Sequence, residues 1–282
     1  MIDTNEVKTI RHSNARISPT AHFTGYVWFR NGLGQRELTT LMGRLGYYSA
    51  AAPDRLHRWA FGVCLEDILL ARHRWLDAKA TSFLRRWPNA QVVELAAGLT
   101  SRGQRMVDAF PGVDWWETDL PGMISRKQSA LKSVKGRTNR LHYEPIDAFA
   151  SSGELSLERL IGTLSTHRPL LIVSEGLLNY FPTCTVEGLW RRLALMLSEF
   201  PAALYLSGVV GNECLQLPIV RPFRWGLALA ARGGITLHYS DALECEAALD
   251  SCGFRSVQVA FPDARRVYRM IAATPQKLAT FG

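Results

Sequence analysis

The chain has 282 residues, of which 47% are hydrophobic and 21% are charged, so it can fold as a globular protein with a full core. Its net charge of +8 comes from basic residues spread along the chain, without the basic and aromatic stripe expected of a nucleic-acid-binding protein. No apolar run is long enough to span a bilayer, the first residues have no signal-peptide core, and five cysteines without a C-x-x-C pair argue against disulfides and zinc. We therefore expect a cytoplasmic protein with no metal, nucleic-acid or membrane partner.

The first part of the chain, up to about residue 88, has few strand signals. Its periodicity predicts helices near Gln35–Leu45 and Leu56–Arg86. An aromatic stretch, Ile17–Trp28, precedes them and carries no strong signal for a helix or a strand.

From Gln91 onward, short apolar runs alternate with amphipathic stretches, which is typical of βα units around a parallel sheet. The predicted strands are Gln91–Ala97, Val113–Asp119, Arg140–Asp147, Pro169–Glu175, Ala203–Val210, Ser256–Phe261 and Tyr268–Ala273. The predicted helices between them are Ser101–Phe110, Pro121–Val134, Leu155–Leu164, Val186–Phe200 and Asp241–Cys252. The pattern predicts a doubly wound α/β fold over residues 89–282.

The end of the chain departs from simple alternation. The connection between the last two predicted strands is too short for a helix, so these strands should pair antiparallel and complete a mostly parallel, seven-stranded sheet. Ser240 and Gly253 are the expected N-cap and C-terminal glycine of the last helix. Residues 211–236 contain two prolines and a glycine pair, which indicates an insertion.

The first predicted strand ends in a turn of small residues that would let a ligand approach the backbone. A dinucleotide site would read G-x-G-x-x-G, whereas only Gly98 is present here. Glu94 lies on the strand before the turn, and an acid there suits a cation better than a phosphate. S-adenosylmethionine, with its ammonium and sulfonium groups, fits this pattern; a purely structural tight turn is the alternative.

The second predicted strand ends at Asp119, about twenty residues after the first turn, which is the spacing of an acid that holds a ribose diol. Asp119 also precedes Leu120, Pro121 and a predicted helix, so it is equally suited to cap that helix. One carboxylate can fill both roles.

Three motifs in this order resemble the leucine carboxyl methyltransferase family, which includes bacterial polyketide O-methyltransferases. They are Val93–Arg102, Glu117–Pro121 with Arg126-Lys127, and Ser174–Pro182. The resemblance covers roughly residues 70–182 well and the remainder by architecture only. It implies a class I methyltransferase that depends on S-adenosyl-L-methionine.

The resemblance also implies which residues bind the cofactor. They are Arg72, Glu94, Ala96, Gly98, Asp119, Leu120, Asp147, Ala148 and Glu175. Arg72 would pair with the carboxylate of the cofactor, Asp119 would hold the ribose, and Asp147 would contact the adenine amino group. For Arg72 a solvated surface arginine is the alternative.

The residues implied at the transfer site are Glu175, Tyr180, His22 and Tyr26. Glu175 would face the methionine end and Tyr180 would line the acceptor pocket. His22 and Tyr26, with Trp28, are included because in the family the N-terminal part, here residues 1–88, packs over the active site as a helical cap; core packing of these aromatics is the alternative. A general base could also come from His142 or His238, which are equally suited to core or surface positions.

The insertion would lie over the acceptor side as a lid. Its arginines stand beside aromatic residues, which suits an acidic and partly apolar small-molecule acceptor. The residues concerned are Arg221, Phe223, Arg224 and Trp225.

The turn departs from the usual family sequence, because Ala96 replaces the first glycine and Thr100 replaces an aspartate. A positive φ at Ala96 would strain the turn by about 1 kcal/mol or more, whereas a negative φ would make the change harmless. We expect an O-methyltransferase that acts on a carboxylate or on a phenolic or enolic hydroxyl of a small specialised metabolite. A non-catalytic methyltransferase-like binding protein and a nicotinamide-dependent oxidoreductase remain alternatives, and the sequence does not specify the oligomeric state.

Overall fold

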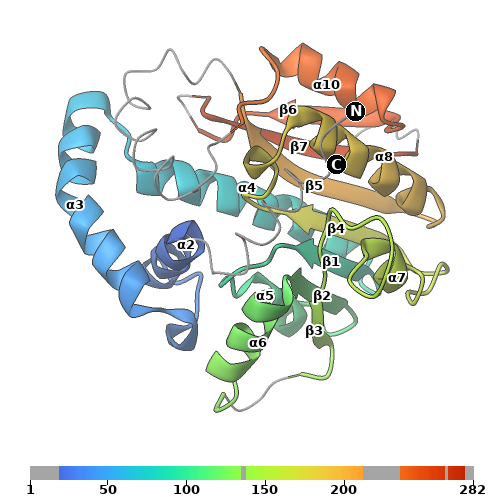
Figure 1. Ribbon diagram of the computed structural model, residues 1–282, viewed down its shortest axis with the longest axis horizontal. Helices are drawn as coiled ribbons and strands as arrows, with labels where there is room; N and C mark the ends of the chain where they lie inside the picture. The colour runs from blue at the N-terminus through green and yellow to red at the C-terminus, as the bar shows by residue number, and fades with distance from the viewer. Residues whose placement is uncertain (1–18, 135–137, 212–235, 264–265, 277–282) are drawn as a thin grey trace.

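Seven strands form one sheet in the order β3-β2-β1-β4-β5-β7-β6 (Figure 1). The computed structural model describes residues 19–134, 138–211, 236–263 and 266–276. The strands are β1 (Gln91–Leu95), β2 (Asp114–Asp119), β3 (Leu141–Pro145), β4 (Leu170–Ser174), β5 (Ala203–Val210), β6 (Ser256–Ala260) and β7 (Tyr268–Thr274). The first five are mutually parallel, and β7 pairs antiparallel with both β5 and β6. The predicted fold class is confirmed.

Helices cover both faces of the sheet, because β1, β4 and β5 carry apolar side chains on both sides. On one face, α4 (Leu65–Arg86) and α5 (Arg102–Ala109) pack on a layer that includes Val92 and Leu171. On the other face, α7 (Leu157–Ile161), α8 (Thr183–Ser198) and α10 (Ala242–Ser251) pack on the neighbouring residues Val93 and Ile172. Each fully buried aliphatic side chain stabilises the fold by roughly 1.5–3 kcal/mol.

The N-terminal helices differ from their predicted boundaries. α3 (Leu41–Phe61) and α4 replace the helices predicted near Gln35–Leu45 and Leu56–Arg86, and only a 3₁₀ turn, η1 (Arg36–Leu38), precedes α3. Thr40 starts α3 by accepting a hydrogen bond from the Gly43 N–H, and Gly62 ends it in a left-handed conformation, with φ 74°. Pro53 lies inside the helix although proline disfavours that position, so packing of α3 on its neighbours outweighs the local cost.

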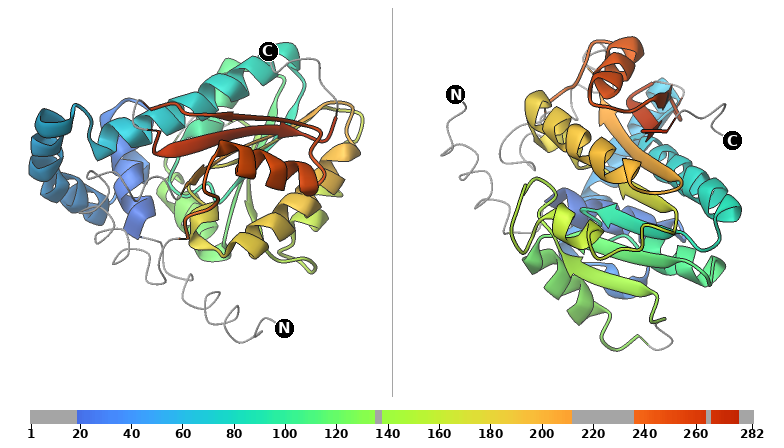
Figure 2. Two further views of the ribbon diagram at one scale, coloured as in Figure 1. Left: turned by 90° about the horizontal axis from the view of Figure 1, so that it is seen from above. Right: turned by 90° about the vertical axis from the view of Figure 1, so that its right-hand side faces the viewer.

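The aromatic stretch without a clear signal forms α2 (Pro19–Arg30). Figures 1 and 2 show α2 and α3 standing beside the sheet, whereas α4 runs along it. The apolar stripe of α4, with Leu76, Ala80 and Leu84, belongs to the core under the sheet. The proposed cap, residues 1–88, and the sheet therefore share part of one hydrophobic core through α4.

Several element ends also shift. The N-cap of α10 is Asp241, which accepts a hydrogen bond from the Glu244 N–H, and not Ser240. Gly253 follows the helix with φ 105°, as predicted. α6 (Pro121–Ala130) ends before Val134, and α8 begins at Thr183 rather than Val186. Within the described ranges, no helix is both long enough and apolar enough to span a membrane.

Candidate active site

The acids predicted at the strand ends lie at one edge of the sheet. Because β1 to β5 are parallel, their carboxyl ends share this edge. Asp119 is the last residue of β2, Asp147 follows β3, and Glu175 follows β4. β1 and β4 are neighbours at the point where the strand order reverses, which is where ligands bind in open α/β sheets.

The turn after β1 is held by the carboxylate of Asp119. One oxygen accepts a hydrogen bond from the Gly98 N–H and the other from the Leu120 N–H, both at 2.8 Å. Burial raises the pKa of Asp119 above its ordinary value, although these two bonds lower it. Leu120, and not Asp119, occupies the N-cap position of α6. Asp119 thus joins the first and second βα turns and leaves further lone pairs for a ligand.

Ala96 has a φ of 51° and Gly98 a φ of 53°. The left-handed region costs a residue with a Cβ roughly 1–2 kcal/mol, so the turn is strained at Ala96. A glycine at this position, as in the usual family sequence, would adopt the same φ without strain.

Replacing Ala96 by Gly is expected to raise the free energy of unfolding by roughly 0.5–1 kcal/mol, because the relief of strain exceeds the entropy that glycine adds to the unfolded chain. Urea unfolding would measure the change. Ala97→Gly is the matched control, since Ala97 does not have a positive φ and should lose stability on the same substitution. Equal destabilisation by both changes would contradict the strain at Ala96.

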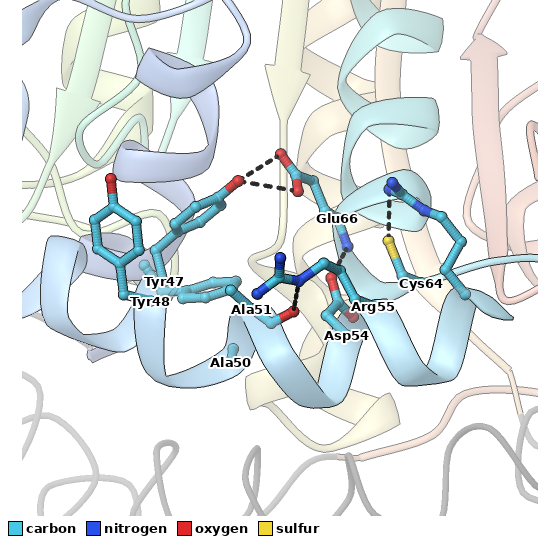
Figure 3. Close-up of a pocket in the computed structure, with 10 residues that line it drawn as sticks. Tyr47, Tyr48, Ala50, Ala51, Asp54, Arg55, Cys64 and Glu66 are labelled. Atoms are coloured by element: carbon cyan, nitrogen blue, oxygen red, sulfur yellow. Dashed lines mark hydrogen bonds between the residues drawn. The ribbon is translucent and has the colours of Figure 1, made fainter. Parts of the chain in front are cut away.

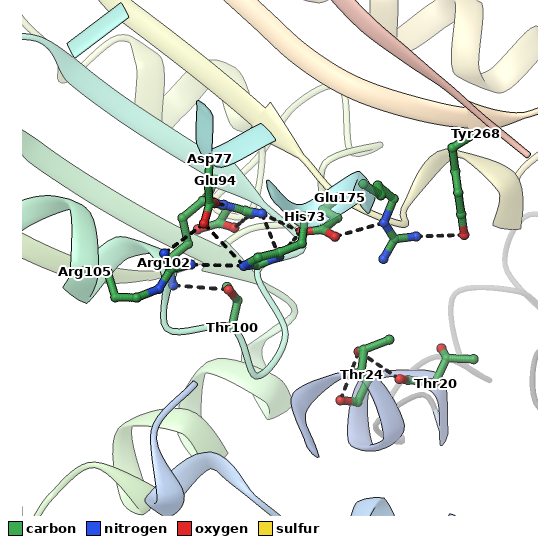
Figure 4. A network of polar contacts seen from close by, with 12 residues as sticks. Thr20, Thr24, His73, Asp77, Glu94, Thr100, Arg102, Arg105, Glu175 and Tyr268 are labelled. Carbon is green, nitrogen blue, oxygen red and sulfur yellow. Dashed lines mark hydrogen bonds and ion pairs between the residues drawn. The ribbon is translucent and has the colours of Figure 1, made fainter. Parts of the chain in front are cut away.

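Glu175, labelled in Figure 4, forms a buried pair with Arg72 beside this turn. Arg72 Nε donates to Glu175 Oε1 at 2.9 Å, and its Nη1 donates to the Tyr268 hydroxyl at 2.8 Å. The guanidinium also lies over the Tyr268 ring, 4.7 Å from its centroid. Gly176, whose φ of 67° favours glycine, lies against the guanidinium, because a Cβ there would be in van der Waals contact with it at 3.5 Å. Arg72 is therefore not a solvated arginine.

A second buried arginine, Arg102, lies at the centre of a larger network (Figure 4). It donates to Asp77 at 2.6 Å, to Glu94 at 2.5 Å and to Glu175 at 2.6 Å. Glu94 receives a further hydrogen bond from the Trp115 indole N–H. Burial raises the pKa of Glu94 to about 7, although Arg102 lowers it. Both Glu94 oxygens thus have partners inside the protein.

His73 fixes the other side of Glu175. Its Nδ1 lies 2.8 Å from Glu175 Oε2, its Nε2 lies 3.0 Å from Arg105 Nη2, and its ring stacks on Trp28. Arg102 Nη2 also lies 2.9 Å from Nδ1, so each ring nitrogen of His73 faces an arginine. An arginine can only donate, and a doubly protonated imidazole has no acceptor, so these contacts favour the neutral imidazole. Burial and the charge of Arg102 lower the pKa of His73, although Glu175 raises it. Burial alone would raise the pKa of Glu175, but His73, Arg72 and Arg102 hold it well below its ordinary value.

The neutral His73 makes stability depend on pH. Its folded-state pKa is below 6.5, so the unfolded chain binds the extra proton first, and this contribution to stability is lost as the pH falls below 6.5. We expect the difference in unfolding free energy between the wild type and His73→Gln to shrink between about pH 7.5 and pH 5. Urea unfolding across this range measures it. A difference that stays constant over this range for His73→Gln would contradict the neutral histidine.

Helix α2 rests on the turn after β1. A Cβ at Gly25 would lie 3.0 Å from Leu99 Cβ, and one at Gly98 would lie 3.8 Å from Ala21 Cβ. The Thr20 hydroxyl lies 2.8 Å from that of Tyr180, which ends the 3₁₀ turn η2 (Leu178–Tyr180). The structure thus brings Tyr180 to α2 at the carboxyl edge of the sheet.

His22 and Tyr26 lie on the side of α2 that faces α3. His22 Nδ1 is 2.8 Å from the Thr40 hydroxyl, and burial, with the charge of Arg126, lowers its pKa. Tyr26 packs against Tyr47 and Tyr48 of α3. The structure does not bring these two side chains to Glu175.

The other predicted residues are placed as follows. Asp147 accepts a hydrogen bond from the Phe149 N–H across Ala148, in the turn after β3. His142 stacks on Trp116, and His238 is buried with its ring nitrogens near the Thr183 hydroxyl and the Leu178 carbonyl. The insertion predicted at 211–236, with its lid arginines, lies almost entirely outside the described residues.

Sequence reasoning missed His73, Asp77, Arg102 and Arg105. A signal for the first two was present: His73 interrupts the buried stripe of α4, and Asp77 follows one helical turn later on the same side. Arg102 appeared in the family-like motif, but nothing in the sequence showed that it would reach three acids.

A cavity lies elsewhere in the described structure, between α2, α3 and α4 (Figure 3). Its volume is about 290 Å³, and its lining includes Phe23, Tyr47, Arg55 and Glu66. None of the residues predicted to bind the cofactor lines it. We place the candidate site at the carboxyl edge because the buried charges and backbone donors converge there.

Comparisons with known proteins identify the family of the chain. The family profile described as Leucine carboxyl methyltransferase matches residues 35–194, more than half of the chain. The tetracenomycin polyketide synthesis O-methyltransferase TcmP of Streptomyces glaucescens is 33% identical over 126 residues, which are 45% of this chain and 42% of that protein. The match therefore spans less than half the length of this curated relative.

Solved structures share the fold at low sequence identity. A DUF574 family protein from Streptomyces avermitilis superposes with a TM-score of 0.63 at 15% identity, over 92% of this chain and all of the other. Human N-acetylserotonin methyltransferase in complex with S-adenosylmethionine superposes with a TM-score of 0.51 at 15% identity, over 86% of this chain and 70% of the other.

Proposed function

The chain belongs to the leucine carboxyl methyltransferase family, and on this premise we propose that it transfers a methyl group from S-adenosyl-L-methionine to an oxygen atom of a small metabolite. The observation that carries the proposal is the buried pair of Arg72 and Glu175 next to the turn that Asp119 holds. A cation and an anion side by side suit the carboxylate and ammonium groups of an amino acid.

The donor set fits the cofactor from one end to the other. Arg72 would hold the carboxylate of its methionine part and Glu175 the ammonium group, and Asp119 with Leu120 would hold the ribose. Asp147 and Ala148 would contact the adenine, while Ala96 and Gly98 would let the cofactor approach the backbone. Glu94 would act on the cofactor only through Arg102, because Glu94 is only 2% exposed and Arg102 and Trp115 bond its oxygens. The Glu175 side chain is 9% exposed, and its Oε1, which accepts from Arg72, has a second lone pair for the ammonium group.

When bound, the cofactor supplies an electrophilic methyl group and a good leaving group. The chain would then need mainly to align the acceptor with that methyl group. Tyr180 would line the acceptor pocket. A carboxylate acceptor needs no general base, whereas a phenol or an enol would use one. The neutral His22 would serve as that base only if α2 turned, or if a water molecule linked His22 to the acceptor hydroxyl.

For the acceptor we propose an acidic, partly apolar metabolite of the polyketide class, bound under a cap formed by residues 1–88 and a lid at 211–236. The similarity to TcmP, a polyketide synthesis O-methyltransferase, supports the class. Contact between α2 and the turn after β1 supports the cap. We also propose that the protein works in the cytoplasm, where its free thiols at Cys64, Cys184, Cys245 and Cys252 would stay reduced.

Calorimetry with S-adenosylhomocysteine, followed by mass spectrometry of reactions with S-adenosylmethionine, tests the proposal. The panel pairs an aromatic polyketide carboxylic acid with analogues that have only the phenol or neither group. We expect micromolar cofactor binding and the mass gain of one methyl group on an acidic acceptor. Binding without any transfer would support a methyltransferase-like binding protein, the alternative that the strained Ala96 favours. Tight binding of a nicotinamide dinucleotide instead would refute the proposal.

A further inference from the structure

Helix α3 has two different faces. Its inner face is fixed to the protein: a Cβ at Gly43 would lie 2.2 Å from the His22 carbonyl oxygen, so the two backbones touch. The Asp54 carboxylate accepts a hydrogen bond from the Leu65 N–H at 2.8 Å, at the start of α4. These contacts determine which side of α3 points outward.

The outer face of α3 is apolar and exposed in the described part of the structure. The described chain exposes eight large hydrophobic side chains, and six of them are on α3. Their exposed fractions are Leu41 70%, Met42 65%, Leu45 54%, Tyr48 53%, Leu56 65% and Trp59 84%. At 3.6 residues per turn they fall within an arc of about 120°. Figures 1 and 2 show α3 at the end of the molecule farthest from β6 and α10.

We propose that this outer face of α3 binds the same face of a second copy of the chain, with the two helices antiparallel. The face is self-complementary about its middle. Leu41 would meet Trp59 of the partner subunit, and Leu45 would meet Leu56 of the partner subunit. Tyr48, a large side chain, would meet the small, exposed Ala52 of the partner subunit. A two-fold contact requires this correspondence between the two halves of one surface.

The area also fits an association of two copies. Six side chains with these exposures offer several hundred Å² of apolar surface per copy, on the order of the ~800 Å² per partner of a standard interface. A typical monomer leaves at most roughly 300–600 Å² in its largest apolar patch. The pairing is independent of the proposed catalytic activity.

Charges beside the outer face of α3 distinguish dimer formation from binding to a lipid membrane. Arg44 and Arg55 flank one edge of the apolar arc, and in the antiparallel pair this edge faces its own copy. Salt screens the repulsion between like charges, so the pair should tighten as salt rises. Binding of the same arginines and apolar residues to an anionic membrane would instead weaken as the salt concentration rises.

Sedimentation velocity of the full chain, from low to high micromolar concentration, tests the association. We expect a dimer that persists or tightens in high salt, and a monomer for the double variant Leu45→Glu, Leu56→Glu. Leu195→Glu is the matched control, because Leu195 is 71% exposed on α8 and should leave the dimer intact. Circular dichroism and binding of S-adenosylhomocysteine verify that each variant is folded.

A mixing experiment tests the antiparallel register. Leu45→Lys alone and Leu56→Glu alone should each be monomeric, whereas a mixture of the two should form a heterodimer with one lysine–glutamate contact and one leucine–leucine contact. Parallel pairing would give no such rescue. A wild type that stays monomeric throughout the range, or a dimer that survives the double substitution, overturns the proposal. So does salt-sensitive binding of a monomer to phosphatidylglycerol vesicles that the double substitution abolishes.

Discussion

Replacing Arg102 by Met is expected to reduce the free energy of unfolding by at least about 3–5 kcal/mol, because removal of one partner leaves buried charges uncompensated. Arg102 is fully buried and pairs with Asp77, Glu94 and Glu175, which come from α4, β1 and the end of β4. Methionine fills much of the volume but donates no hydrogen bond. Three carboxylates would then have to find protons, water or new partners.

Equilibrium unfolding in urea or guanidinium chloride would measure this loss. Arg105→Met is the matched control, since Arg105 also pairs with Asp77 but is 30% exposed, and it should cost clearly less. Arg102→Lys should fall between the two, because one ammonium group cannot reach all three acids. If Arg102→Met and Arg105→Met lost the same small amount, Arg102 would not be the centre of this network.

Replacing Asp119 by Asn is expected to weaken the binding of S-adenosylhomocysteine by about 100-fold, because hydrogen bonds to a charged group contribute roughly 1.5–3 kcal/mol each. The carboxylate accepts from Gly98 and Leu120 and would also accept from the ribose hydroxyls. An amide group presents one acceptor and one donor, so it cannot serve both backbone N–H groups and the diol.

Calorimetry gives the affinities, and a ligand analogue without the two ribose hydroxyls separates the two effects of the substitution. The loss for this analogue should be much smaller than for S-adenosylhomocysteine. Asp114→Asn, at the opposite end of β2, where Asp114 pairs with Arg140 and Arg168, is the control and should bind normally. An equal loss for both ligands would mean that Asp119 supports the turn but does not hold the ribose.

The sheet could be predicted because its signals are local. β1, β4 and β5 are short apolar runs buried on both faces. The acids at the ends of β2, β3 and β4 follow directly from the sequence order. The path of α3 through Pro53 could not be predicted, because the contact of Gly43 with α2 is tertiary and outweighs the local preference of proline.

The candidate site was predictable where residues follow strands and unpredictable where helices supply them. Asp119 and Glu175 needed only the strand ends. To predict where His22 and Tyr26 lie, one must know how α2 is rotated about its own axis. A stretch without clear hydrophobic periodicity does not indicate this rotation. His73 and Arg102 meet at Glu175 from two different helices, and the sign of φ at Ala96 depends on the same packing.

The place of β7 in the sheet has a consequence for how the chain is synthesised. β7 is the last of the described strands in sequence, yet it lies between β5 and β6, and β6 pairs with no other strand of the described sheet. While a ribosome is still making the chain, β5 has an open edge along eight mostly apolar residues, and open apolar edges aggregate. A message truncated before residue 268 would leave that edge permanently open. We therefore expect such nascent products to require chaperones, although the cofactor-side residues up to Glu175 would already have been translated.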